Sequence, residues 1–148
     1  MRRVASLTAE ISTMVYPTEV EDKVRELLRS LCGEDCSVKE ERFSSHYGYS
    51  FKVLTCELPP NSAEELLKRV ICSLDKFDLM SLMETLSARL EGRNLYIRLS
   101  KQDLAVGVFK LYKGDSGGYL RLKFPFRKAD LESIREAITK VGRDCTQT

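Results

Sequence analysis

Basic residues concentrate in one stretch of the sequence, where they could bind phosphate groups. Residues 89–128 contain ten Lys or Arg against three Asp or Glu, although the whole chain of 148 residues has a net charge of only +2. The flanking regions are acidic, since residues 1–88 carry 11 basic and 15 acidic side chains and residues 129–148 carry three and four. A segregated positive charge of this kind favours a polyanion such as RNA as the partner.

The spacing within this stretch would collect the basic residues on one face of a sheet. A strand beginning at Tyr119 would place Arg121 and Lys123 on one face and three apolar side chains on the other. A second strand would likewise present Tyr96 and Arg98 together. Aromatic and basic side chains on a sheet surface can stack on bases and pair with phosphates. The candidate RNA-binding residues are Tyr96, Arg98, Lys101, Lys110, Tyr119, Arg121, Lys123, Arg127 and Lys128.

Catalytic signatures are absent from the sequence. It has no phosphate loop, no Gly-x-Gly-x-x-Gly, no zinc-hydrolase helix motif and no serine elbow. A carboxylate such as Asp103 or Asp115 could hold a metal in a small nuclease or hydrolase, but no acidic pair stands out. The single histidine, His46, has no nucleophile or acidic partner near it in the sequence. We therefore expect a protein that is not an enzyme and needs no cofactor.

The five cysteines form no regular framework. Cys32 and Cys36 are separated by three residues and could begin a zinc site, but a structural zinc site needs two further ligands at close spacing, so we expect no metal. A disulfide between these two stays open, because intracellular disulfides occur in hyperthermophiles. Cys56 and Cys72 fall at apolar positions of an expected strand and helix, and we interpret them as small buried residues.

Length and composition predict one globular domain with an ordered core over about residues 5–142. The hydrophobic content of 43% and the charged content of 31% are ordinary for a soluble protein. No apolar run has the length of a signal peptide or a membrane span, so we expect a cytoplasmic protein with no membrane partner.

The pattern of apolar residues and turn signals predicts an α+β fold. The expected strands are residues 6–16, 37–43, 49–58, 94–99, 104–112 and 119–126, and the expected helices are about 18–32, 62–74, 75–90 and 130–141. The order β-α-β-β-α-α-β-β-β-α favours a mostly antiparallel sheet covered by helices, with the last three strands as a β-meander. Capping boxes are expected at Thr18 with Glu21 and at Ser62 with Glu65.

Two segments of the sequence resemble a known family. They are Tyr16–Arg25 (YPTEVEDKVR) and Asn94–Gly107 (NLYIRLSKQDLAVG). Together they are similar to an archaeal family of small RNA-binding proteins described as exosome-associated subunits, and the order of elements matches over nearly the whole chain. That family is similar in fold to the ribosomal protein that binds five-S ribosomal RNA. The resemblance implies the same α+β fold, an RNA partner and a link to RNA processing or degradation.

The sequence therefore predicts a non-catalytic RNA-binding domain in which basic residues contact phosphates and Tyr96 or Tyr119 stacks on bases. The alternative is a protein-interaction or assembly module that docks an acidic partner or forms a homodimer, for example through an exposed strand edge. Both hypotheses have the same net charge, so a binding measurement is needed to separate them.

Overall fold

The computed structural model describes residues 8–33, 36–114, 118–127 and 130–145. In chain order the elements are β1 (Ala9–Val15), α1 (Glu21–Cys32), β2 (Val38–Ser44), β3 (Ser50–Leu58), α2 (Pro60–Ser73), α3 (Lys76–Glu84), α4 (Leu86–Arg89), β4 (Leu90–Glu91), β5 (Asn94–Ser100), α5 (Lys101–Leu104), β6 (Tyr119–Pro125) and α6 (Leu131–Asp144). Among the helices of these ranges, none is long and apolar enough to cross a membrane.

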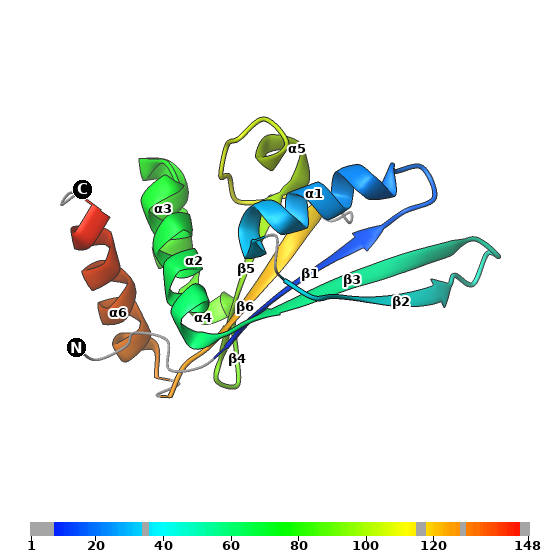
Figure 1. Ribbon diagram of the computed structural model, residues 1–148. Coiled ribbons are helices and arrows are strands. Elements are labelled where there is room, and N and C mark those ends of the chain that lie inside the picture. Colours follow the sequence, from blue (N-terminus) through cyan, green and yellow to red (C-terminus); the bar gives the residue numbers. More distant parts are fainter. Residues whose placement is uncertain (1–7, 34–35, 115–117, 128–129, 146–148) are drawn as a thin grey trace.

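A single six-stranded sheet in the order β2-β3-β1-β6-β5-β4 runs through the molecule, and every described pair of strands is antiparallel (Figure 1). The first strand of the chain lies inside the sheet, where Ser12 is in register with Thr55 on one side and with Arg121 on the other. The predicted α+β class and antiparallel sheet are therefore confirmed.

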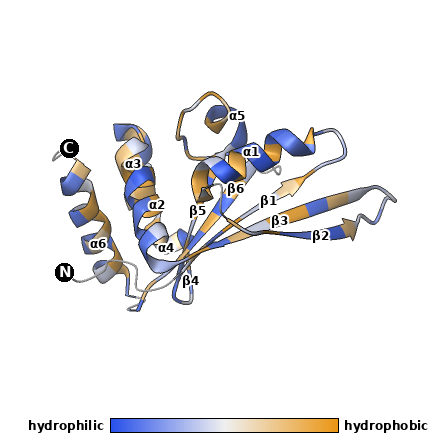
Figure 2. Ribbon diagram, viewed as in Figure 1, coloured by the Kyte–Doolittle hydropathy of each residue, from blue (hydrophilic) through white to orange (hydrophobic). Residues whose placement is uncertain are grey.

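One face of the sheet is buried beneath helices and the other is not. Strands β1 and β6 alternate buried and half-buried residues along their whole length, as the period of two predicts. The buried set forms the core with apolar residues of α1, α2 and α6, and Figure 2 shows the orange, apolar sides of the helices turned toward the sheet. Four of the central strand residues, Ile11, Leu54, Ile97 and Leu122, have no exposed surface. We call the opposite, half-exposed side of β1, β3, β5 and β6 the open face.

The expected strand 104–112 is not formed, so the prediction of a β-meander is wrong. The hydroxyl of Ser100 accepts a hydrogen bond from the Asp103 backbone N–H and caps the short helix α5 at this point. Gly107, with a φ of 81°, then turns the chain. Of these residues, only Leu111 returns to the sheet, in an isolated bridge with Leu99. β6 therefore pairs with β5 on one side and with β1 on the other.

Helix termini differ from the sequence expectations at three places. The two capping boxes do not form: α1 begins at Glu21, whose carboxylate pairs with Lys52 and Arg25, and α2 begins at Pro60 without a side-chain cap. The expected helix 75–90 divides at Thr85, whose hydroxyl donates to the Ser81 carbonyl and competes with regular helix bonding.

The cysteines also correct the sequence analysis. Cys56, expected as a free buried residue, is joined to Cys36, so the disulfide that had stayed open between Cys32 and Cys36 is not the one present. Cys72 is exposed and is joined to Cys145, and this bond ties α2 to the end of α6. The last helix, expected to end at about Val141, continues to Asp144.

Candidate nucleic-acid interface

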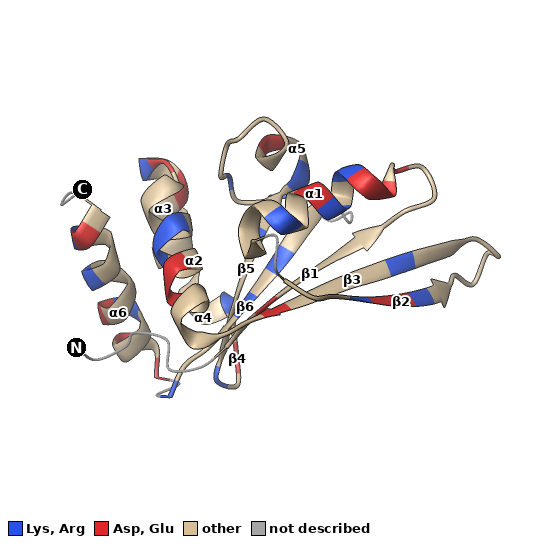
Figure 3. Cartoon of the chain, viewed as in Figure 1, with Lys and Arg blue, Asp and Glu red and all other residues tan. Residues whose placement is uncertain are grey.

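The strand pair β5 and β6 places two arginines side by side on the open face. Arg98 is in direct register with Arg121, and both side chains point away from the core because their neighbours Ile97, Leu99 and Leu122 are buried. Figure 3 shows basic residues on these two strands. Like charges directly opposite each other destabilise an antiparallel pair. This arrangement therefore needs a compensating contact.

No compensation comes from a carboxylate. Within the described residues, no Asp or Glu lies within ion-pair distance of either guanidinium group. The Nε atom of Arg121 is buried and has no hydrogen-bond partner in that part of the chain. The pair of guanidinium groups thus has unused capacity for an anion with several acceptor oxygens, such as a phosphate.

Each of the two guanidinium groups packs on a tyrosine ring that lies diagonally across the β5–β6 pair. The guanidinium of Arg98 lies 4.6 Å from the ring centroid of Tyr119, and that of Arg121 lies 5.0 Å from the ring centroid of Tyr96. A third ring, Tyr112, packs against Tyr119 with 5.2 Å between centroids. Cation–π contacts of this kind orient an arginine without neutralising it. The result is a surface on which aromatic and cationic groups alternate.

Two hollows border Arg121 on this surface. The larger, of about 470 Å³, is lined by Tyr96, Arg98, Arg121 and Tyr112 together with residues 88–91. The smaller, of about 180 Å³, is lined by Ser12 and its neighbours in β1, by Val53 of β3, and by Tyr119 and Arg121 of β6. Because they share this side chain, the two hollows are adjacent and together offer a track across β5, β6 and β1.

Arg89 belongs to the larger hollow, although the sequence analysis did not select it. Burial lowers the pKa of its guanidinium, the nearby charge of Arg98 lowers it further, and Asp78 opposes this by raising it. Its Nε donates to the hydroxyl of Thr85 at 2.8 Å, which fixes its direction. Arg89, at the end of α4, and Tyr112, outside any strand, were both missed because the sequence does not show that these two segments fold against β5 and β6. The only available signal for Arg89 was its position at the start of the basic stretch.

The remaining candidate residues lie around this centre. Lys123 follows Arg121 on the open face and is partly neutralised by Glu10, whose carboxylate is 3.7 Å from its Nζ. Lys110 is exposed, and its carbonyl accepts a hydrogen bond from the Ser100 backbone beside β5. Arg127 is exposed just after β6. Lys128 lies outside the described residues.

Lys101 is the candidate residue that is buried, among those that the structure describes. It is only 6% exposed, and its Nζ donates to the Met14 carbonyl at 2.6 Å and to both carboxylate oxygens of Glu19 at 3.0 Å. Its ammonium group also lies 5.5 Å from the ring centroid of Tyr16. These internal contacts engage its ammonium group and join α5 to β1, so we leave Lys101 out of the candidate interface.

The carboxylates considered as metal ligands do not gather into a cluster in the described part of the chain. Asp103 is half-buried in the first turn of α5, and no group of three acidic or histidine side chains gathers around it there. Asp115 lies outside the described residues. His46 is exposed at the tip between β2 and β3, where its ring meets that of Tyr47 edge to face.

Known proteins are similar to this chain in sequence and in fold. The chain is 28% identical to "RNA-binding protein PAB1135" of Pyrococcus abyssi over 137 residues, which cover 85% of this chain and 89% of that protein. Its fold is similar to the crystal structure of SSO0741 from Sulfolobus solfataricus (TM-score 0.76, 22% identity, 93% and 98% of the two chains). It is also similar to Mth689, a DUF54 protein from Methanothermobacter thermautotrophicus (TM-score 0.72, 26% identity, 90% and 96%). A family model described as RNA binding matches residues 8–126, and the chain therefore belongs to this RNA-binding family.

Proposed function

We propose that the open face binds single-stranded RNA without cleaving it. In this proposal, five basic side chains contact phosphates and Tyr96 and Tyr119 stack on bases. The five are Arg98, Lys110, Arg121, Lys123 and Arg127. The observation that carries the proposal is the opposed pair of Arg98 and Arg121, which lies on a half-exposed sheet surface without a carboxylate partner among the described residues.

A single strand suits this surface better than a duplex does. Bases in a duplex are stacked on each other, whereas bases of a single strand can be splayed onto aromatic rings. Three tyrosine rings, Tyr96, Tyr112 and Tyr119, lie next to the two central guanidinium groups. Phosphates on the arginines and bases on the adjacent rings would use both parts of the surface at once.

The direct test is fluorescence anisotropy of a labelled single-stranded RNA and a matched duplex, titrated with the protein at several salt concentrations. Five phosphate contacts to a single strand would make log K fall with log salt at a slope of about −3.5. We expect saturable binding that prefers the single strand, and labelled RNA that stays intact with Mg²⁺ present. A slope near zero, or cleavage that depends on Mg²⁺, would contradict the proposal.

Stacking makes a separate prediction for Tyr96. Replacing Tyr96 by Ala should weaken single-strand binding by at least about fivefold, because base–aromatic stacking contributes about 1–3 kcal/mol per base. The salt slope should stay unchanged, since no charge is removed. Tyr96→Phe keeps the ring and is the matched control, expected to bind like the unaltered protein. Equal losses in both variants, measured by the same anisotropy titration, would argue against stacking.

A protein-interaction module is the second candidate, and one feature of the sheet favours it. The edge strand β2 is almost entirely exposed, and Phe43 of this strand is 42% exposed although it stacks on Phe51 of β3. An uncovered edge can pair with a strand of another molecule. Light scattering with and without RNA separates the candidates, because a stable oligomer that ignores RNA would favour assembly. A role in RNA processing or degradation stays a prediction from the resemblance.

A further inference from the structure

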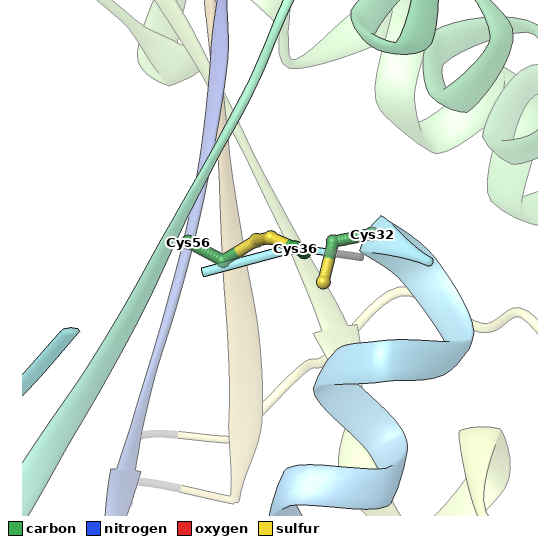
Figure 4. A group of neighbouring side chains, drawn as sticks. All are labelled: Cys32, Cys36 and Cys56. Atoms are coloured by element: carbon green, nitrogen blue, oxygen red, sulfur yellow. A yellow bond between two sulfur atoms is a disulfide. The ribbon is translucent and has the colours of Figure 1, made fainter. Parts of the chain in front are cut away.

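Three cysteine sulfurs gather at the end of α1, away from the basic residues of β5 and β6. Cys32 is the last residue of α1, Cys36 lies just before β2, and Cys56 lies within β3. Their Sγ atoms are all within 4.8 Å of one another. Figure 4 shows the three side chains together at the end of α1. Cys36 and Cys56 form a disulfide, whereas Cys32 keeps a free thiol beside it. A structural disulfide has no need of this third sulfur.

We propose that the reduced form of this cluster binds a thiophilic divalent cation of the zinc class through Cys32, Cys36 and Cys56. Zinc–thiolate bonds are about 2.3 Å long, so the sulfurs of a tetrahedral site lie about 3.8 Å apart. The observed separations, all within 4.8 Å, need only small side-chain movements to reach this value. Opening the disulfide also lets its two sulfurs separate to the distance that a shared ion requires.

The backbone holds the three cysteines in place from separate elements. Helix α1 ends at Cys32 because Gly33 takes a φ of 91° and donates its N–H to the Arg29 carbonyl. Two residues after Cys36, Val38 is in register with Cys56, so the pairing of β2 with β3 brings these two cysteines together. Helix and sheet hydrogen bonds thus bring the segments that carry the three sulfurs together, in addition to the disulfide.

Solvent reaches this cluster only at two of its three cysteines. Cys56 is only 1% exposed, whereas Cys32 and Cys36 are half-buried and reach solvent. An ion could enter past these two residues and be held against the buried third ligand. Among the described residues, no fourth Cys, His, Asp or Glu joins the group. Three thiolates would leave one position of a tetrahedral site for water or another donor, as in zinc sites that have three protein ligands.

The disulfide and the metal site are alternative states, because they use the same two sulfurs. A phosphine reduces the disulfide to the thiol form that can bind metal. It gives two electrons to the Cys36–Cys56 bond and takes the oxygen of one water molecule to become a phosphine oxide. The two protons of that water are transferred to the sulfurs. When a divalent cation then binds, each of the three thiols gives up its proton to the solvent.

The test uses the full chain reduced with a phosphine under nitrogen and titrated with Cd²⁺, whose bonds to thiolates give an ultraviolet charge-transfer band. We expect one Cd²⁺ per chain by native mass spectrometry, with this band. Cys32→Ser should weaken binding at least about 100-fold, because the loss of even an outer-shell partner reduces metal affinity 10–100-fold. Oxidation to the disulfide should abolish the band, and reduction should restore it.

The second cysteine pair supplies the control. Cys72 and Cys145 join α2 to α6, and replacing both by Ser should leave the Cd²⁺ affinity unchanged in the reduced protein. Cys32 is chosen for substitution because it is half-buried at a helix end and free of the disulfide, and circular dichroism checks that the variant folds. An equal charge-transfer band in the Cys32→Ser variant, or the absence of a band in the folded, reduced protein, would overturn the proposal.

Discussion

Replacing Arg98 and Arg121 together by Gln is expected to weaken single-stranded RNA binding about 25-fold at about 0.1 M salt, and to make the salt slope shallower by about 1.4. Each phosphate contact contributes about 0.7 to the slope for a single strand, and the electrostatic part of the affinity vanishes near 1 M salt. Each lost contact therefore removes about a factor of five at 0.1 M. Anisotropy titrations over a salt series measure both quantities.

A matched variant separates this effect from a general change in charge. Lys23 and Arg29 are exposed residues of α1, on the side of the sheet opposite the open face. Replacing both by Gln removes the same two positive charges from a surface that the proposal does not use. Its affinity and slope should stay close to those of the unaltered protein. Equal losses in the two double variants would mean that net charge, and not this face, determines RNA binding.

Replacing Arg98 and Arg121 by Gln also tests whether this arginine pair serves binding rather than stability. Arg98 and Arg121 lie directly opposite each other, and like charges in this position are destabilising. Removing both should leave the free energy of unfolding unchanged or slightly higher, even though two cation–π contacts are lost. A large loss of stability in urea would instead identify the pair as structural.

Local periodicity was enough to predict the two faces of the sheet. In β6, Arg121 and Lys123 alternate with buried residues because a strand turns successive side chains to opposite faces, whatever its partners are. The same rule placed Tyr96 and Arg98 together on β5. These four residues were predicted correctly as one surface, since the prediction needed only the period of each strand.

Register and long-range pairing could not be predicted in this way. The sequence does not show that Arg98 faces Arg121, since that depends on which strands pair and with what offset. The expected strand 104–112 failed because a Ser100 cap and the turn at Gly107 were stronger local signals than its alternation. The cysteine cluster was missed for the same reason, because its third member, Cys56, comes from a different hairpin strand.

Lys101 shows most clearly how a basic residue can mislead. From the sequence it is one more cation in the basic stretch, but its ammonium group is enclosed by Glu19 and by the Met14 carbonyl. Replacing Lys101 by Met should lower the free energy of unfolding by about 2–3 kcal/mol. The change removes charged hydrogen bonds and leaves the Met14 carbonyl without its donor at a largely buried position. This loss of stability is smaller than that for breaking a fully buried ion pair, because the Glu19 side chain is 28% exposed. Urea unfolding measures the loss.

Lys110 gives the reciprocal control, because it is exposed and lies at the edge of the proposed RNA surface. Lys110→Met should change the free energy of unfolding by less than about 0.5 kcal/mol, as exposed substitutions usually do, but should weaken RNA binding by about fivefold at 0.1 M salt. Lys101→Met should do the opposite, lowering stability while the folded protein keeps its RNA affinity. If the two folded variants instead lost RNA affinity equally, Lys101 would have to contact the RNA. The proposal that RNA binds to the open face would then be wrong.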